Sequence, residues 1–285
     1  FFIEKLLSSR RISSKIFRKK IILMSLVNTD WLLENLDNVK IIDSSWHLPN
    51  QNRNAKKEYS NEHILNSIFF DIDKNSDQET DLPHMLPSTI RWENIVSNLG
   101  ISNEDTIIIY DNSDLISSCR CWYTFLYFGH DPSLVSVLNG GLKKWKQEEK
   151  PTVNSLTEIN RSIYKARENK EMVKSKIEID RNINLKNFKV VDARSLERFE
   201  GKAPEPRSNL RRGSIEGSAC IPFNQLINKS NNTFKNIKDL NQIFKKTLNT
   251  QDNNIVFSCG SGVTASVLAL AYSLINTKYT PTIYD

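Results

Sequence analysis

The chain repeats itself, and this repeat restricts the possible folds more than any other feature of the sequence. The segment "VKIIDSSWHL" at 39–48 returns as "FKVVDARSLERF" at 188–199, and "EDTIIIYDNSD" at 104–114 returns as "DNNIVFSCGSG" at 252–262. Each copy contains a short apolar run that ends on a polar residue, which is typical of a buried strand. Helical stretches alternate with these strands in both copies. The sequence therefore predicts an α/β fold of two tandem domains, each a mostly parallel sheet flanked by helices.

The composition divides the chain into four segments. Residues 1–24 form a basic segment, residues 25–147 contain the first copy, and residues 185–285 contain the second. The polar stretch 148–184 between the copies is predicted to be a linker. The final "TPTIYD" aligns with "LVSVLNG" of the first copy, so "NGGLKKW" has no counterpart. We therefore expect the second domain to lack its last segment.

The formal charge of +6 is concentrated at the start of the chain. The first 20 residues contain seven Lys or Arg and one acidic residue, and the remaining residues balance to zero. A basic surface for nucleic acid is therefore not expected. The first segment is basic and Ser-rich with spaced apolar residues, which is typical of an organelle transit peptide, and a disordered basic tail is the alternative. We expect a mitochondrial location, or a cytoplasmic one if translation starts at Met24, and no membrane span.

The four cysteines do not form a disulfide framework, and their spacing does not indicate zinc. Three of them, Cys119, Cys121 and Cys220, are interpreted as incidental thiols that fill apolar positions. No metal site and no organic cofactor are expected.

The fourth cysteine stands in "IVFSCGSGVTASVLALA", where a predicted strand passes through a short loop into a predicted helix. Gly260 and Gly262 allow successive backbone N–H groups to converge on the sulfur of Cys259 at a helix N-terminus. These N–H groups favour the thiolate over the thiol. Ser261 and Thr264 add hydroxyl groups that can donate to sulfur or polarise a carbonyl. The pattern predicts that Cys259 is a nucleophile.

A loop of this kind could also hold a phosphate ester. Cysteine-dependent phosphatases place an arginine six residues after the cysteine, where its planar fork holds two phosphoryl oxygens. Ala265 occupies that position here, so phosphatase chemistry is the weaker interpretation.

In the first copy, Asp111 stands where the second has Cys259. A carboxylate is not a sulfur nucleophile, so the first domain is predicted to be non-catalytic.

Taken together, the motifs resemble those of the two-domain rhodanese-type sulfurtransferases, and within that family the branch that uses 3-mercaptopyruvate. "FFDIDKNSD", "LPHMLP", "NGGLKKW", "RFEGKAPEPR", "GSIEGSACIPF" and "CGSGVTA" follow one another between about Asp30 and Asp285. Family members specialised for thiosulfate resemble "CRKGVT", with two cations after the cysteine. This chain has Gly260 and Ser261 instead, and a neutral loop fits a substrate whose charge lies away from the reacting sulfur.

The resemblance implies roles for residues that spacing alone does not identify. It implies a catalytic set of Cys259, Ser261, His84 and Asp73. It also implies a substrate-binding set of Arg198, Arg207, Gly260, Gly262, Val263 and Thr264, in which the two arginines hold the substrate carboxylate.

The implied reaction transfers sulfur from 3-mercaptopyruvate through a persulfide on Cys259. Pyruvate is released, and the sulfur passes to a thiol acceptor such as thioredoxin, to a small dithiol or to cyanide. Two alternatives stay open. One is a thiosulfate sulfurtransferase, and the other is a non-catalytic sulfur-binding or interaction module in which the second domain has no competent cleft.

Overall fold

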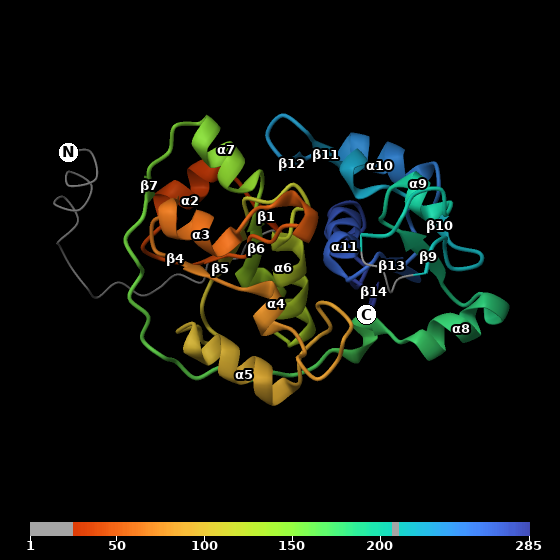
Figure 1. Ribbon diagram of the computed structural model, residues 1–285, viewed down its shortest axis with the longest axis horizontal. Helices are drawn as coiled ribbons and strands as arrows, with labels where there is room; N and C mark the ends of the chain where they lie inside the picture. Colours follow the sequence, from red (N-terminus) through yellow and green to blue (C-terminus); the bar gives the residue numbers. More distant parts are fainter. Residues whose placement is uncertain (1–24, 207–210) are drawn as a thin grey trace.

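The computed structural model describes residues 25–206 and 211–285 and shows two α/β domains side by side (Figure 1). Each domain has a five-stranded sheet in which every strand pair is parallel. The first sheet contains, in spatial order, β1 (Leu26–Val27), β6 (Val135–Leu138), β5 (Ile107–Tyr110), β2 (Lys40–Asp43) and β4 (Ser67–Phe69). The second contains β10 (Ala219–Cys220), β9 (Lys189–Asp192), β13 (Ile255–Ser258), β14 (Ile283–Tyr284) and β8 (Val173–Lys174). The predicted fold class is confirmed.

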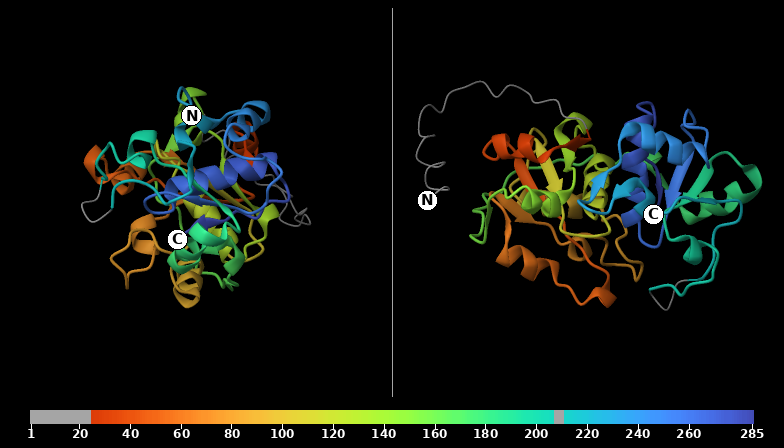
Figure 2. Two further views of the ribbon diagram at one scale, coloured as in Figure 1. Left: turned by 90° about the vertical axis from the view of Figure 1, so that its right-hand side faces the viewer. Right: turned by 90° about the horizontal axis from the view of Figure 1, so that it is seen from above.

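Helices surround both sheets, as Figure 2 shows from two further directions. The first domain contains α2 (Thr29–Asn35), α3 (Ala55–Asn61), α4 (Ile72–Asn75), α5 (Thr89–Asn98), α6 (Ser118–Tyr127) and α7 (Gly141–Gln147). The second contains α8 (Lys176–Leu185), α9 (Leu196–Phe199), α10 (Ile237–Lys245) and α11 (Val263–Ile275). Two small antiparallel pairs complete the strands: β3 (His63–Ile64) with β7 (Thr152–Val153), and β11 (Ile227–Asn228) with β12 (Thr233–Phe234). The 3-10 helices are η1 (Pro49–Gln51), η2 (Pro132–Leu134), η3 (Lys170–Met172) and η4 (Phe223–Leu226).

The two copies of the sequence repeat occupy equivalent places in the two sheets. Strand β2 pairs with β5 so that Asp43 lies opposite Tyr110, and β9 pairs with β13 so that Asp192 lies opposite Ser258. The residues of β5 and β13 are all buried, because helices cover both faces of each sheet. Cys259 follows β13 directly, and Asp111 follows β5 directly, so the two residues occupy equivalent places in the two domains.

The predicted linker at 148–184 is wrong in its last part. Strand β8 pairs with β14 at the edge of the second sheet, and α8 follows it, so residues 173–184 belong to the second domain. The earlier part packs against the first domain, because β7 pairs with β3 and Tyr164 is buried. The basic segment predicted over residues 1–24 lies outside the described residues, as does Arg207.

The domain interface is built from equivalent helices. Helix α6 follows β5 in the first domain, α11 follows β13 in the second, and the two helices pack against each other. A single apolar core continues from one domain into the other and includes Tyr123 and Phe125 of α6 with Leu268 and Tyr272 of α11. Because α11 starts directly after the Cys259 loop, this packing places the loop beside the first domain. Within the described ranges, no helix has both the length and the apolar character needed to cross a bilayer.

Candidate active site

The Cys259 loop connects β13 to α11 and leaves the cysteine partly exposed. The backbone N–H of Ser261 points at the sulfur, with 3.5 Å between the nitrogen and Sγ. Gly262 caps α11 with φ +75°, a conformation that L side chains rarely adopt. A Cβ added there would lie 2.5 Å from Nη1 of Arg120, so close packing also requires glycine.

Three residues predicted from the family resemblance meet beside this loop. His84 Nδ1 lies 3.0 Å from Ser261 Oγ, and its Nε2 lies 2.8 Å from Asp73 Oδ1. The imidazole is almost fully buried and spans the gap between the two domains. Trp46, which the sequence did not single out, donates its indole N–H to both oxygens of Asp73 at 3.1 and 3.0 Å and packs edge-on against His84. The arrangement forms a hydrogen-bonded chain from Asp73 through His84 to Ser261.

The segment that carries His84 is held by both domains. His84 has φ +61°, and its carbonyl oxygen accepts a hydrogen bond of 2.5 Å from Nη2 of Arg120 in α6. The same Nη2 lies 2.7 Å from Oδ1 of Asp285, and Oδ2 of Asp285 accepts from the Leu86 N–H at 3.0 Å. Both charged side chains are about 95% buried, with exposed fractions of 4% and 5%. Arg120 and Asp285 thus fix the backbone on either side of Met85 against the end of the second sheet.

Arg198 lies on α9, at the rim of the cavity that Cys259 lines. Its guanidinium is bound by Glu205, with Nη2 at 2.5 Å and Nε at 3.2 Å from Oε2. The other oxygen of Glu205 binds Arg194, which also binds Asp192 at the end of β9. This cluster of two arginines and two carboxylates carries no net formal charge, and sequence reasoning overlooked Glu205 and Arg194.

Two cavities share the wall formed by Cys259, Gly260 and Ser261. The smaller has a volume of about 230 Å³ and contains Arg198, together with Val263 and Thr264 from the start of α11. The first domain contributes Trp46, Leu48 and Leu115 to it. The larger has a volume of about 460 Å³ and lies on the side of Gly262, α8 and the loop before α5. All the predicted site residues that the structure describes therefore line one of these cavities or contact a residue that does.

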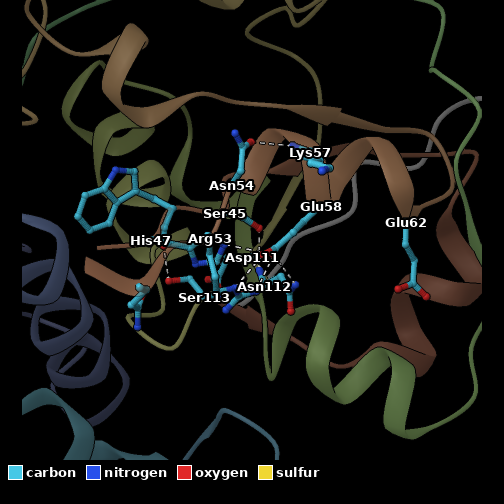
Figure 3. A network of polar contacts seen from close by, with 12 residues as sticks. Ser45, His47, Arg53, Asn54, Lys57, Glu58, Glu62, Asp111, Asn112 and Ser113 are labelled. Carbon is cyan, nitrogen blue, oxygen red and sulfur yellow. Dashed lines mark hydrogen bonds and ion pairs between the residues drawn. The ribbon is translucent and has the colours of Figure 1, made fainter. Parts of the chain in front are cut away.

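The first domain has a longer loop at the equivalent place, between β5 and α6, and this loop begins with Asp111 (Figure 3). Asp111, directly after β5, accepts hydrogen bonds from the N–H of Ser113 at 2.9 Å and from the N–H of Ser118 at 2.8 Å. In the second domain the corresponding N–H of Ser261 points at the sulfur. The carboxylate of Asp111 therefore occupies the place of the thiol. Burial raises the pKa of Asp111, and its carboxylate binds the backbone N–H groups of the loop.

A polar network closes this loop against α3. Arg53 binds Glu58 through two nitrogens and donates to the carbonyl of Asn112 at 3.0 Å. Asn112 returns a hydrogen bond to Glu58 at 3.0 Å, and its N–H donates to Ser45 at 2.8 Å. Figure 3 shows these groups converging on the backbone next to Asp111. The network leaves the first loop without an exposed nucleophile.

The other cysteines differ from Cys259 in their surroundings. Cys119 and Cys121 are buried in α6, and burial raises the pKa of both thiols. Burial also raises the pKa of Cys220 to about 11. These thiols are therefore protonated near neutral pH. Within residues 25–206 and 211–285, no three His, Cys, Asp or Glu side chains gather in a way that could hold a metal ion.

Comparison with known proteins agrees with this architecture. The model of the "Rhodanese-like domain" family matches residues 28–148 and 175–285. The chain is 36% identical over 282 residues to the Arabidopsis thaliana protein named "Thiosulfate/3-mercaptopyruvate sulfurtransferase 1, mitochondrial", covering 91% of this chain and 73% of that protein. It is 34% identical over 269 residues to the mouse "3-mercaptopyruvate sulfurtransferase", covering 92% and 89%.

A solved structure shows the same two-domain arrangement. The crystal structure of SseA from Escherichia coli, described as a 3-mercaptopyruvate sulfotransferase with the rhodanese fold, superposes with a TM-score of 0.82 at 31% identity. The match covers 92% of this chain and 98% of that one. The chain belongs to the rhodanese family and is a sulfurtransferase built from two rhodanese-like domains.

Proposed function

We propose that this chain transfers sulfur from 3-mercaptopyruvate through a persulfide on Cys259. One observation carries the proposal: Cys259 shares a cavity with a cationic side chain, Arg198, and its loop is joined through Ser261 to a histidine–aspartate pair. 3-Mercaptopyruvate has a sulfur to attack, a carboxylate to bind, and a leaving group that needs a proton. The site has a group of the matching kind for each of these three needs.

The first half-reaction forms one bond and breaks one. The Cys259 thiolate attacks the sulfur of 3-mercaptopyruvate, and a sulfur–sulfur bond forms as the carbon–sulfur bond breaks. The electron pair of the broken bond stays with carbon and gives the enolate of pyruvate. One proton converts the enolate to pyruvate, and Cys259 keeps the transferred sulfur as a persulfide.

The hydrogen-bonded series Asp73–His84–Ser261 transfers the proton. The carboxylate of Asp73 accepts the Nε2–H of His84, so the free electron pair of the imidazole is on Nδ1, facing the hydroxyl of Ser261. His84 can then take a proton through Ser261 as the thiolate forms, and return it to the enolate as pyruvate leaves. The negative charge of Asp73, oriented by the indole N–H of Trp46, stabilises the imidazolium between these two events.

The charge balance of the cavity favours a carboxylate donor over thiosulfate. Glu205 and Asp192 balance the charges of Arg194 and Arg198, so this cluster presents a weak field rather than a strongly positive one. A dianion such as thiosulfate gains less from such a field than from two cations placed next to the cysteine. We propose that Arg207, two residues after Glu205, completes the carboxylate site with Arg198. Thiosulfate transfer remains the second candidate, because the Arabidopsis relative is named for both donors.

We further propose that the first domain contributes cleft residues but no nucleophile, and that the second domain is catalytic. The acceptor is a thiol, such as thioredoxin or a small dithiol, or cyanide in an assay. A mitochondrial location is proposed from the basic first segment and from the name of the Arabidopsis relative, with a cytoplasmic form if translation starts at Met24.

The proton relay gives a test that separates the two donors. The enolate that leaves 3-mercaptopyruvate must be protonated, whereas sulfite leaves thiosulfate as a stable anion. His84→Gln should therefore slow single-turnover persulfide formation from 3-mercaptopyruvate by about 100-fold or more, the usual contribution of a general acid, and slow thiosulfate turnover far less.

His130→Gln is the matched control, because it also removes a buried imidazole of the first domain, one that binds the carbonyl of Asp105 and no group of the Cys259 loop. This control should leave the ratio of the rates with 3-mercaptopyruvate and thiosulfate unchanged. Equal losses with both donors in His84→Gln would contradict the proposed role of the relay. No persulfide from 3-mercaptopyruvate in the unmodified protein would contradict the proposed function itself.

A further inference from the structure

We propose that the two cavities at Cys259 serve the two half-reactions, and that the larger one receives a small thiol acceptor that carries carboxylate groups. The inference rests on the proposed persulfide, and it assigns the acceptor's path and chemical class. The smaller cavity takes the donor, because it contains Arg198. The larger cavity reaches the same sulfur by a different route.

The segment around His84 divides the two routes. Trp46, which packs edge-on against His84, lines the smaller cavity. The residues on either side of His84, Pro83 and Met85, line the larger one. The hydrogen bond from Ser261 to His84 therefore runs between the cavities, and an acceptor can approach Cys259 without passing the donor's carboxylate site.

Most charged groups that face the larger cavity are already paired. Arg194 binds Asp192 and Glu205, and Asp285 binds Arg120. Two cations that line the same cavity, Lys176 and Arg211, are not paired in this way.

Lys176 begins α8, Arg211 lies in the loop after α9, and both are exposed. Neither has an ion pair or a side-chain hydrogen bond with another residue in the described part of the chain. The cavity therefore presents two uncompensated positive charges, which attract an anionic ligand.

The rest of the wall suits the carbon skeleton of a small molecule. Leu82, Met85, Ile215 and Tyr284 contribute apolar surface, and Leu82 is 52% exposed. A volume of about 460 Å³ lies within the range of small-molecule sites, and is twice that of the donor cavity. A folded protein acceptor would meet the rim and would not need this volume. Apolar walls with two cations at the edge match a thiol whose short carbon chain bears carboxylates.

The transfer itself balances without a further reactant. The acceptor thiolate attacks the outer sulfur of the Cys259 persulfide, and a new sulfur–sulfur bond forms as the bond to Cys259 breaks. The electron pair stays with Cys259, which returns to the thiolate, and the product is the persulfide of the acceptor. Lys176 and Arg211 bind the acceptor's carboxylates and take no part in the bond changes.

The test starts from protein loaded with sulfur from inorganic polysulfide, so that its outcome does not depend on which donor the enzyme uses. The loaded protein is mixed with 2-mercaptoethanol, which is neutral, or with mercaptosuccinate, which has two carboxylates, and loss of the persulfide is followed over time. For Lys176→Glu/Arg211→Glu we expect the rate with mercaptosuccinate to fall about tenfold more than the rate with 2-mercaptoethanol, the effect of reversing two exposed charges. Lys176 is the first residue of its helix, where glutamate is well tolerated.

Arg181→Glu/Lys238→Glu is the matched control, since it makes the same change in net charge at exposed helical positions that do not line the cavity. It should leave the ratio of the two rates unchanged. An unchanged ratio in Lys176→Glu/Arg211→Glu, or the same change in the control, would overturn the proposal. The proposal would also be overturned if Lys176→Glu/Arg211→Glu reduced the transfer rate to reduced thioredoxin more than the rate to mercaptosuccinate. The surface would then dock a protein.

Discussion

Replacing Arg120 by methionine tests how the two domains hold the His84 segment. The guanidinium of Arg120 and the carboxylate of Asp285 lie 2.7 Å apart, and both are almost completely buried. Methionine keeps most of the side-chain volume but leaves Asp285 with a buried charge and one hydrogen bond, from the Leu86 N–H. It also removes the donor to the carbonyl of His84.

The expected loss is large because, among the residues that the structure describes, the Asp285 carboxylate has no ion pair other than the one with Arg120. Removing one partner of a buried ion pair costs about 3–5 kcal/mol of unfolding free energy. Arg53→Met is the control: Arg53 pairs with Glu58 at a similar distance of 2.5 Å, but those side chains are 32% and 30% exposed. We expect a smaller loss for Arg53→Met, because solvent screens the charge that a partly exposed pair leaves behind.

The measurement is urea unfolding of four variants. Three are the single changes Arg120→Met, Arg53→Met and Asp285→Asn, and the fourth is the double change Arg120→Met/Asp285→Asn. The double variant should lose clearly less than the sum of its single changes, because Asp285→Asn removes the charge that Arg120→Met leaves unpaired. A loss below about 1 kcal/mol for Arg120→Met would refute the reasoning, as would strictly additive losses in the cycle.

Three further predictions concern single positions. Gly262→Ala should lower the unfolding free energy by at least about 1–2 kcal/mol, since alanine is strained at φ +75° and its Cβ would press on Arg120, and an unchanged urea midpoint would contradict this. Burial raises the pKa of Asp43 to about 6, against hydrogen bonds from Ser45 that lower it, so the folded state binds the extra proton. Stability should therefore fall by up to about 3 kcal/mol as the pH rises from 4 to 6, and Asp43→Asn should reduce that fall in urea titrations. Arg198→Ala should lower kcat/KM for 3-mercaptopyruvate about 10- to 100-fold in a pyruvate assay, and an equal loss with thiosulfate would mean that the arginine is a general anion site.

The fold was predictable from sequence because the strongest signals are local. The apolar runs before Asp43, Asp111, Asp192 and Cys259 are buried on both faces of their sheets, so each appears as a short continuous hydrophobic stretch. Residues 173–184 were wrongly assigned to the linker because their local hydrophobic signal is weak. Strand β8 has two half-buried residues, and α8 buries only Ile179 and Asn182, so composition there does not differ from that of a linker.

The site was predictable only in part, because its contacts join distant parts of the chain. Cys259 and its glycines lie in one loop, and the family resemblance supplied Asp73, His84 and Arg198. The ion pair of Arg120 with Asp285 spans 165 residues, and no local pattern connects the two. The position of Arg120 in an otherwise uncharged helix is the one signal that could have identified it, since a buried arginine requires a partner.

The central claim is that Cys259 carries the transferred sulfur, and peptide mass spectrometry tests it most directly. After incubation with 3-mercaptopyruvate, the peptide that contains Cys259 should gain one sulfur atom, and those with Cys119, Cys121 or Cys220 should not. Cys259→Ser should release no pyruvate, because a hydroxyl is far less ionised than a thiol. A persulfide on another cysteine, or pyruvate release by Cys259→Ser, would contradict the account.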